Sequence, residues 1–417
     1  MRIGVPYLDR ELAFEVPERN LLAIVEPNEV EVAGSAEELV RGAIERPIDS
    51  VPFGEFLEGA RKILVIVNDA TRPTPTQELL DAVGDELEAR EARFLVATGA
   101  HRAPTEEEYR QILGRHYGRF RKRIEAHNAR DASSLVDLGK TRNGTPILLN
   151  RALVEADRVV ATGSVEPHYF AGYTGGRKAF LPGVAGYATI EANHRLALDP
   201  RAKALALEDN PVSQDMEDAL RLLPARAFSV MAVLDKEQRL AGCFAGDIRG
   251  SFRAAVAAAD AIFAVHLPGR AEVVVSVARH PMDIDLYQAQ KAIDNGALAL
   301  EDGGILILVA SCRDGVGDRA YIDLLGSSAT PQEARARIAA GYRLGYHKAA
   351  KIAQVASRAS MWAVSELEEE TLRKAFITKR SSLGEAVEAA LRQKGPGARL
   401  AVLMDGTVTV PLVEGAR

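Results

Sequence analysis

A buried apolar run followed by a polar tip is the pattern that most constrains the fold of this chain. Mostly apolar runs occupy residues 62–67, 93–97 and 157–163. Continuous runs of this kind are typical of parallel strands buried on both faces. The first two runs lead through polar residues into predicted helices, at 75–88 and after Pro104. Because ligands bind at the carboxyl ends of strands in open α/β sheets, we expect chemistry at one edge of this sheet.

The polar residues after the first two runs include candidates for that chemistry. Asp69 and Arg72 follow the first run, and His101 follows the second. An arginine can hold a carboxylate through a bidentate fork, and a histidine titrates near neutral pH and suits acid–base work. The structural alternatives are a helix cap formed by Asp69 or Thr71 and a turn histidine satisfied by the backbone. Both interpretations stay open on these residues alone.

The third run leads into an unusual stretch at residues 165–194, which is rich in glycine and positive charge. Its centre contains three glycines followed by two cations, namely Gly172, Gly175, Gly176, Arg177 and Lys178. Glycine permits sharp turns and close approach, and backbone N–H groups with cations can wrap an anion. No Ser or Thr follows Lys178, so the Walker pattern is absent. The alternative is a glycine-rich surface turn with solvated cations.

Two histidines flank this loop. His168 lies between Pro167 and an aromatic pair, and it suits acid–base work or a structural role equally well. His194 falls in a helix predicted over 189–198. Its only nearby carboxylate on that helix is Glu191, so a metal site closed by protein ligands alone is disfavoured.

The second half of the chain repeats the α/β pattern. We predict strands at 272–277 and 304–310, a helix at 285–298 and another at 331–340. The spacing of Tyr287, Gln288 and Lys291 places them on one helix face, where they offer hydrogen-bond donors to an anionic substrate or form a solvated surface. A hairpin or two short strands are expected at 12–25. Hairpins are expected around Asn143-Gly144 and at 400–413, with a linker at 266–270.

Length and pattern together define the expected architecture. A chain of 417 residues exceeds one typical core. We expect two α/β domains with mostly parallel sheets and an active-site cleft between them. The N-terminal domain is predicted at 1–267, including the glycine-rich segment, and the C-terminal domain at 268–417.

Composition excludes several classes of protein. A net charge of -6 and a pI near 5.9 show no basic footprint for nucleic acid. No apolar run reaches the length of about 18–20 residues that a membrane span needs, and no secretory signal is apparent. Cys243 and Cys312 are isolated, which favours a reducing cytoplasm. A dinucleotide-binding G-x-G-x-x-G pattern with an acidic residue about 20 positions on is missing, which argues against a nicotinamide dehydrogenase.

A further polar and aromatic group in the second half has no assigned role. It consists of Arg343, Tyr346, His347, Lys348 and Trp362. The single tryptophan suits either stacking on a planar ligand or packing in the core.

Four separated motifs resemble one known family. DATRP at 69–73, TGAHR at 98–102, the stretch at 165–194 and YQAQK at 287–291 occur in the order seen in the nickel-pincer-nucleotide lactate racemase family. These motifs span most of the chain.

The resemblance implies a cofactor. Family members carry nickel in a pyridinium-3-thioamide-5-thiocarboxylic acid mononucleotide, which is attached covalently to a lysine that corresponds to Lys178. A histidine that corresponds to His194 completes the nickel ligands, and soft sulfur donors with an imidazole suit this metal. Asp69 is implied to lie near the cofactor. The resemblance and the loop together imply further cofactor contacts at Gly172, Gly175, Gly176 and Arg177.

The resemblance also implies a reaction. His101 and His168 correspond to the acid–base pair, and Arg72, Tyr287, Gln288 and Lys291 to substrate or cofactor contacts. The implied function is racemisation or epimerisation of a lactate-like 2-hydroxy acid by reversible hydride transfer. The implied partners are that small molecule and the enzymes that build the cofactor, while the particular acid and the oligomeric state stay open. The alternative is a non-racemising nucleotide- or anion-binding protein that uses the glycine-rich loop only as a phosphate cradle.

Overall fold

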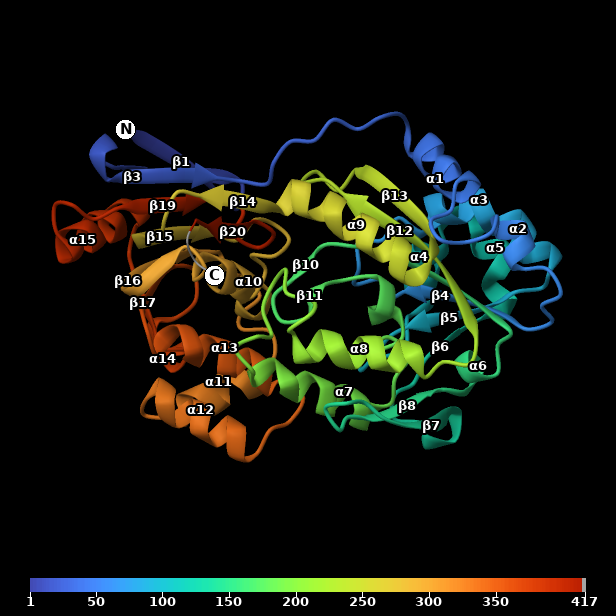
Figure 1. Ribbon diagram of the computed structural model, residues 1–417. Helices are drawn as coiled ribbons and strands as arrows, with labels where there is room; N and C mark the ends of the chain where they lie inside the picture. The colour runs from blue at the N-terminus through green and yellow to red at the C-terminus, as the bar shows by residue number, and fades with distance from the viewer. Residues whose placement is uncertain (415–417) are drawn as a thin grey trace. The chain divides into compact units, whose positions relative to one another are not determined.

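The computed structural model describes residues 1–414, which form two compact units (Figure 1). One unit is Glu29–Ile262, and the other combines Met1–Asn28 with the chain from Phe263 onward. Both units are α/β with large, mostly parallel sheets, so the predicted fold class is confirmed. The first 28 residues were expected with the N-terminal domain, but they pack with the C-terminal unit because strand β3 (Leu21–Val25) pairs there with β19 (Leu400–Leu403).

The unit Glu29–Ile262 is built on a six-stranded sheet with the order β13-β12-β9-β4-β5-β6. Its strands are β4 (Ile63–Asn68), β5 (Arg93–Ala97), β6 (Ile124–Ala126), β9 (Arg158–Ser164), β12 (Arg226–Leu234) and β13 (Leu240–Asp247). Only β13 runs antiparallel to its neighbour. The three apolar runs predicted as strands are β4, β5 and β9, and each is buried as expected.

Helices of this unit cover the sheet and close its core. They are α1 (Ala36–Glu45), α2 (Phe53–Phe56), α3 (Thr76–Ala89), α4 (Glu106–Leu113), α5 (Tyr117–Phe120), α6 (Arg151–Val154), α7 (Tyr187–Arg195), α8 (Pro211–Arg221) and α9 (Ile248–Phe263). A capping box formed by Ser35 and Glu38 begins α1. Leu79 and Leu80 of α3 pack against buried valines of β4, and burying each such side chain contributes about 1.5–3 kcal/mol.

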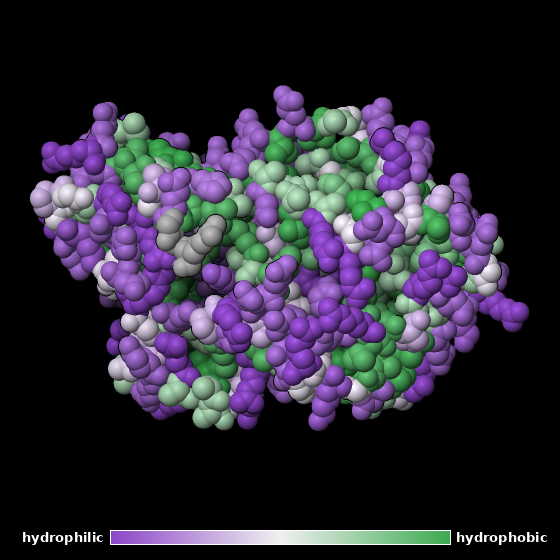
Figure 2. Space-filling view, in the orientation of Figure 1, coloured by the Kyte–Doolittle hydropathy of each residue, from purple (hydrophilic) through white to green (hydrophobic). Residues whose placement is uncertain are grey.

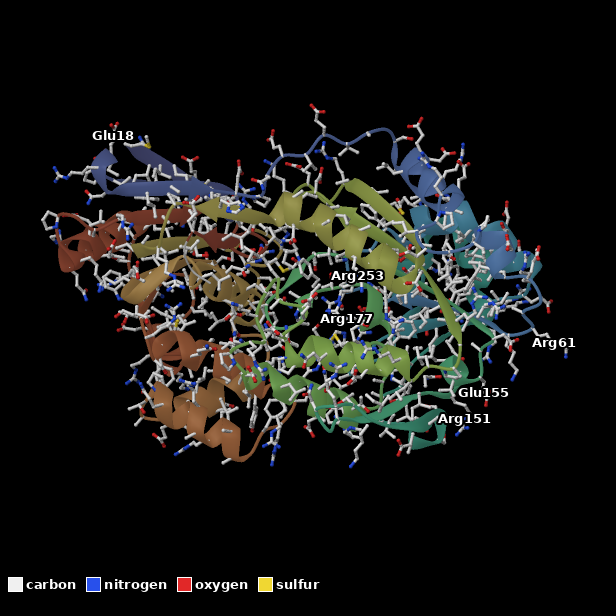
Figure 3. All side chains as sticks on the ribbon, in the orientation of Figure 1. Glu18, Arg61, Arg151, Glu155, Arg177 and Arg253 are labelled. Carbon is white, nitrogen blue, oxygen red and sulfur yellow. The ribbon has the colours of Figure 1, made fainter. Side chains whose placement is uncertain are left out.

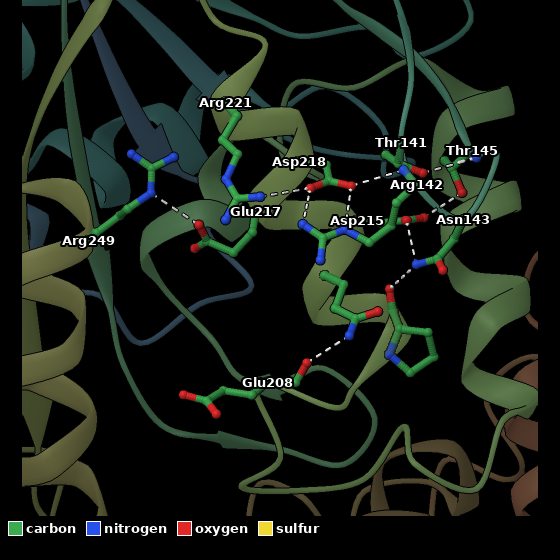
Figure 4. A network of polar contacts seen from close by, with 12 residues as sticks. Thr141, Arg142, Asn143, Thr145, Glu208, Asp215, Glu217, Asp218, Arg221 and Arg249 are labelled. Carbon is green, nitrogen blue, oxygen red and sulfur yellow. Dashed lines mark hydrogen bonds and ion pairs between the residues drawn. The ribbon is translucent and has the colours of Figure 1, made fainter.

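The turn at Asn143-Gly144 joins β7 (Leu135–Lys140) and β8 (Pro146–Asn150) as an antiparallel hairpin, as predicted. A polar network anchors this hairpin to α8 (Figure 4). The buried Asp215 of α8 accepts hydrogen bonds from Asn143 at 3.0 Å and from the Thr145 hydroxyl, and Asp218 pairs with Arg142 at 2.6 Å. The network fixes α8, which in turn contacts α7.

The second unit contains a six-stranded sheet in which all neighbouring strands are parallel, with the order β18-β17-β16-β15-β19-β3. Its further strands are β15 (Ala271–Val277), β16 (Leu300–Val309), β17 (Ser360–Val364) and β18 (Ile377–Lys379). Its helices are α10 (Leu286–Gly296), α11 (Arg319–Gly326), α12 (Pro331–Ala340), α13 (Tyr346–Ala356), α14 (Glu369–Lys374) and α15 (Leu383–Lys394). The helices predicted at 285–298 and 331–340 are therefore confirmed.

Strand pairings at the chain ends differ from the sequence-based expectation. The N-terminal hairpin is formed by β1 (Arg2–Tyr7) and β2 (Arg10–Glu15). Of the two alternatives predicted over 12–25, the two short strands are confirmed and the hairpin is wrong, because β3 joins the large sheet. The hairpin predicted over 400–413 is also wrong. β19 enters the large sheet, while β20 (Val410–Val413) pairs in parallel with β14 (Ala264–Leu267). The expected linker at 266–270 therefore begins inside a strand.

Residues 195–265 contain two strands, β12 and β13, of which only β12 has the continuous apolar pattern of a buried strand. β13 contains two glycines and is mostly made of small residues, so its pairing with β12 is decided by position and not by local preference.

The described chain has no helix that is both long and apolar enough to cross a membrane. The face of the molecule in Figure 2 is largely hydrophilic, with smaller hydrophobic areas between polar side chains.

Candidate active site

Three neighbouring strands bring predicted site residues to one edge of the sheet. β9, β4 and β5 are adjacent and parallel, so their carboxyl ends lie side by side. Asp69 follows β4, His101 follows β5, and the two-residue strand β10 (Pro167–His168) follows β9. The predicted convergence of three strands on one edge is confirmed.

Asp69 and His101 form a hydrogen-bonded pair at this edge. Nδ1 of His101 lies 2.8 Å from Oδ2 of Asp69, and Oδ1 accepts a hydrogen bond from the Thr71 hydroxyl at 2.6 Å. Burial would raise the pKa of Asp69, but the hydrogen bonds from His101 and Thr71 outweigh it and hold that pKa below its ordinary value. Because an ionised carboxylate only accepts hydrogen bonds, Nδ1 of His101 carries a proton toward Asp69, and in the corresponding neutral tautomer Nε2 presents the lone pair.

The helix-cap alternative for this segment is wrong. α3 begins at Thr76, and its N-cap residue is Pro75. The side chain of Asp69 instead closes a local turn on Thr71 and receives His101. The pairing of Asp69 with His101 was missed at the level of sequence, because 32 residues separate the two partners.

Arg72 presents its guanidinium at the surface beside Asp69. Its backbone N–H donates to the Asp69 carbonyl at 3.2 Å. Its side chain is exposed and forms no ion pair with any residue in the described range 1–414. Such a guanidinium is available to hold a carboxylate through two parallel hydrogen bonds.

Three predicted site residues, His168, Lys178 and His194, lie around the buried ring of Phe170. The ring of His168 lies 4.6 Å from that of Phe170, and the ring of His194 lies 5.1 Å from it, both in edge-on contact. Nζ of Lys178 lies 5.8 Å from the Phe170 ring centroid. We call His168, Phe170, Lys178 and His194 the Phe170 cluster. Phe170 was not predicted as a site residue, although its place two positions after His168 was a signal.

The imidazole of His168 is held differently from that of His101. The backbone N–H of Ala171 donates to Nδ1 of His168 at 3.3 Å, and the Tyr169 ring stacks on the imidazole at 5.0 Å. When Nδ1 accepts, the proton of the neutral ring lies on Nε2. His168 is therefore oriented as a proton donor through Nε2, whereas His101 is oriented as an acceptor.

His194 is neutral across the physiological range. Burial and the neighbouring Lys178 cation lower the pKa of His194 to about 3. His194 lies in α7, as predicted, and the adjacent Asn193 donates to the Val212 carbonyl of α8 at 3.2 Å. The helix that carries His194 is thus fixed by α8 and its network. A neutral imidazole keeps a lone pair for a metal or a hydrogen bond.

The three glycines of the loop serve close packing of the chain on itself. A Cβ at Gly172 would lie 2.2 Å from the Ala206 carbonyl oxygen, and one at Gly175 would lie 2.6 Å from Val165. The N–H of Gly176 donates to the Met231 sulfur at 3.3 Å. All three glycines have positive φ, which only glycine adopts easily. The phosphate cradle expected at these glycines stays a prediction.

Arg177 points into the interior, in contrast to surface residues such as Arg61 and Arg151 (Figure 3). Its guanidinium donates to the Ala171 carbonyl at 3.2 Å and to Ser213 of α8 at 3.1 Å, and it lies over the Phe252 ring. Burial lowers the pKa of Arg177 to about 10. These contacts support the loop from within, and a cofactor contact of Arg177 stays a prediction.

Tyr287, Gln288 and Lys291 share α10 in the other unit, as the spacing predicts. Asp285 caps this helix by accepting from the Gln288 N–H at 2.7 Å. Nζ of Lys291 lies 3.4 Å from the sulfur of Met282. All three side chains are partly exposed, and their predicted contact with substrate stays a prediction.

Lys348 of α13 contacts α10 through Tyr287. Its Nζ lies 3.7 Å from the centroid of the Tyr287 ring and donates to the Tyr287 carbonyl. Burial and the neighbouring Lys291 lower the pKa of Lys348 to about 7. Trp362, in β17, is buried in the core beneath Arg380, whose guanidinium carbon lies 3.6 Å from its ring. The core interpretation of Trp362 is therefore confirmed.

His347 of α13 pairs with a neighbouring tyrosine. Its Nδ1 lies 3.0 Å from the Tyr342 hydroxyl, and its side chain is buried. Across residues 1–414, no three His, Cys, Asp or Glu side chains gather closely enough to hold a metal ion.

The arrangement of side chains at this sheet edge indicates a class of protein. An open α/β sheet carries two differently oriented histidines, an exposed arginine and a half-buried lysine–histidine cluster near its carboxyl edge. This arrangement is suited to an enzyme that moves protons on a small anionic ligand.

Comparisons with known proteins narrow this class. Residues 7–205 match the lactate racemase N-terminal domain, and residues 268–410 match the lactate racemase C-terminal domain. The chain is 29% identical to a lactate racemase of Thermoanaerobacterium thermosaccharolyticum, over 98% of each chain. It is 30% identical to a lactate racemase of Lactiplantibacillus plantarum, over 97% of this chain and 98% of that one.

Solved structures agree with these matches. The lactate racemase apoprotein of Thermoanaerobacterium thermosaccharolyticum superposes with a TM-score of 0.91 at 28% identity, covering 99% of this chain and 100% of the other. A protein from Thermotoga maritima shares the fold, with a TM-score of 0.67 at 16% identity over 91% of this chain and 98% of the other. The chain belongs to the lactate racemase family, and it is an isomerase. The alternative of a protein without racemase chemistry is not favoured by these findings.

Proposed function

We propose that this chain racemises or epimerises a lactate-like 2-hydroxy acid. The relatives named lactate racemase support this substrate class. The observation that carries the proposal is the opposite orientation of two histidines, since Nε2 of His101 presents a lone pair and Nε2 of His168 presents a proton. An enzyme that inverts a carbinol centre needs a proton acceptor and a proton donor that exchange roles between enantiomers.

We further propose that Lys178 and His194 hold a nickel-pincer mononucleotide. The residues fit this group in two respects. His194 is neutral and offers one imidazole donor, while the described chain provides no set of protein ligands that would complete a metal site. A metal at His194 therefore needs donors from a ligand, and sulfur donors beside an imidazole suit nickel. Lys178, which shares the Phe170 ring with His194, is close enough to be the attachment point.

The chain's own residues then divide the work of the reaction. Arg72 holds the substrate carboxylate through its free guanidinium edge. His101 removes the hydroxyl proton of one enantiomer through Nε2, while Asp69 steadies the imidazolium that forms. His168 takes up a proton from solvent to become an imidazolium and gives the Nε2 proton to the oxygen when the opposite enantiomer is formed, which returns its ring to the neutral form. His101 releases the proton it gained to solvent, so each ring ends the cycle neutral. When bound, the nucleotide supplies the acceptor and donor of the C2 hydride. Tyr287, Gln288 and Lys291 are proposed as further substrate or cofactor contacts.

Intact-protein mass spectrometry tests the covalent part of this proposal. The chain is co-expressed with cofactor-building enzymes and nickel as wild type, as Lys178→Ala and as a control, Lys203→Ala, at an exposed lysine of the same unit. We expect a sulfur-bearing mononucleotide adduct in the wild type and the control and none in Lys178→Ala. Chiral chromatography of D- and L-lactate incubated with the loaded protein tests the reaction itself.

Two results would contradict the proposal. Absence of the adduct, under conditions that load a known family member, would remove Lys178 from the mechanism. An adduct without interconversion of any 2-hydroxy acid in a chiral panel would leave the cofactor in place and reject the reaction.

A further inference from the structure

A cavity of about 510 Å³ lies beside His101 in the unit Glu29–Ile262. Its walls are the loop 99–103 after β5, the segment 126–130 after β6, and Tyr187 at the start of α7. Because β5 and β6 are adjacent parallel strands, the cavity lies at the same sheet edge as the acid–base residues. It is large enough for a drug-sized ligand and far exceeds the needs of a three-carbon acid.

The walls of this cavity carry basic and amide side chains and no carboxylate. The polar side chains among its lining residues are His101, Arg102, His127, Asn128, Arg130 and Tyr187. A wall of this composition favours a negatively charged occupant.

Two of these side chains, His127 and Arg102, already have hydrogen-bond partners within the protein. Nδ1 of His127 lies 3.0 Å from the Asn150 amide, and its Nε2 lies 2.9 Å from the Ala185 carbonyl oxygen. Burial lowers the pKa of His127, so its ring is neutral. Arg102 forms two hydrogen bonds of 2.7 Å with the Glu108 carboxylate, which compensates its charge.

Arg130 is the uncompensated cation of the cavity. It forms no ion pair with any residue in the described range 1–414, and its guanidinium carbon lies 3.7 Å from the centroid of the Tyr187 ring. Stacking on an aromatic face restricts an arginine while leaving the edge of its fork open to an anion.

The surroundings of Arg130 hold its backbone in place. Oδ1 of Asn128 accepts from the Arg130 N–H at 3.0 Å, which leaves the Asn128 amide group as a donor. The Tyr187 N–H donates to the Ala129 carbonyl at 2.8 Å. The cation, the amide and the aromatic platform therefore form a preorganised set.

We propose that this cavity is an anion subsite, in which Arg130 and Asn128 bind a carboxylate or phosphate of the ligand that extends from His101. The nature of that ligand rests on the proposed function. The charge has two sources, the second carboxylate of a hydroxy diacid substrate or the phosphate of the nucleotide. The subsite itself is a property of the apoprotein, so binding can be measured without activity.

Calorimetry on the cofactor-free protein tests the subsite directly. Inorganic phosphate and malate are titrated into wild type, Arg130→Met, Arg130→Lys and a control, Arg151→Met, at an exposed arginine outside the cavity. We expect Arg130→Met to weaken binding about tenfold or more, as loss of a bidentate fork does. Arg130→Lys should be intermediate because it keeps the charge but loses the fork, and the control should match wild type.

The loaded enzyme then separates the two sources. If the subsite takes a second substrate carboxylate, Arg130→Met raises KM for malate about tenfold and leaves KM for lactate unchanged. If it takes the nucleotide phosphate, the variant lowers the fraction of adduct seen by mass spectrometry, whichever substrate is used. Either result supports the subsite.

The inference is overturned if Arg130→Met equals the Arg151→Met control in calorimetry with both probes. Failure of the proposed function gives a different signature, because anion binding that depends on Arg130 would then persist in a protein that racemises nothing. Thermal unfolding of each variant confirms that a loss of binding is not a loss of folding.

Discussion

His101 and His168 are oriented by two different kinds of partner. A buried, ionised carboxylate holds His101, whereas a backbone N–H and two aromatic rings hold His168. The carboxylate attracts a proton to the near nitrogen, and the N–H repels one from it. The same side chain is thereby set as an acceptor in one place and as a donor in the other.

The difference also concerns rigidity. The side chain of His101 is 55% exposed, and its orientation depends on one partner. His168 is stacked on Tyr169 and touches the edge of the buried Phe170 ring, so packing as well as hydrogen bonding limits it. Variants that remove each kind of partner should therefore fail in different ways.

Removing either imidazole should produce the largest effect. We expect His101→Ala and His168→Ala each to lower kcat for racemisation about 10²- to 10⁴-fold, the usual contribution of a general acid or base. The enantiomer that suffers more should differ between the two variants, because each histidine serves one direction. Rates measured from pure D- and pure L-substrate test this. Full activity of both variants in both directions would reject the assigned roles.

Asp69→Asn should have the next largest effect, and it acts on one histidine only. The amide can donate as well as accept, so it no longer selects the Nδ1–H tautomer of His101. We expect kcat to fall about 10- to 100-fold, as for other partners that orient a functional imidazole. The fraction of covalent adduct serves as the control and should not change. A loss of adduct equal to the loss of rate would show that Asp69 acts on the cofactor instead.

Phe170→Leu tests the packing side of the comparison. Loss of the ring contacts should cost about 1 kcal/mol of stability and reduce adduct formation several-fold. Phe180→Leu is the matched control, since Phe180 is equally buried but has no ring contact with His168 or His194 within the described range. Equal adduct in both variants would show that the Phe170 cluster has no role in loading.

The smallest expected effect is a pH dependence of stability at Asp69. Its pKa is lowered in the folded protein, so the ionised form contributes stability above the unfolded pKa of about 3.9. That contribution is lost as pH falls through the lower folded pKa. The difference in free energy of unfolding between wild type and Asp69→Asn should therefore shrink below about pH 4. Urea titrations at pH 3 and pH 7 measure it, and a difference that grows on acidification would contradict stabilisation by the hydrogen-bonded Asp69 carboxylate.

Much of the local structure could be predicted because its signals lie within a few residues. β5 and α12 match the expected ranges 93–97 and 331–340, and the capping box at Ser35 is present. Asp69, His101 and His168 were found because each follows a recognisable apolar strand, and parallel strands place their ends at one edge.

Contacts between distant segments could not be predicted in this way. The segments β19 and β20 look like hairpin partners, but each pairs with a strand from elsewhere in the chain. Arg177 directly follows the glycines of the loop, and that position indicated a cation at the surface. Its side chain instead lies in the interior and donates a hydrogen bond to Ser213. In both cases the outcome depends on which distant surfaces bury one another, which no local pattern records.

The sequence by itself determined the α/β class, the order of the motifs and the family, since these depend on short periodic patterns and on residue identity. Only the tertiary structure decided which group Nδ1 of each histidine faces, namely the Asp69 carboxylate for His101 and the Ala171 N–H for His168. It also revealed Phe170 at the centre of its cluster and the uncompensated Arg130 beside His101. The physical reason is that a tautomer, an unpaired charge and a shared ring are properties of neighbours in space, and folding chooses those neighbours from remote parts of the chain.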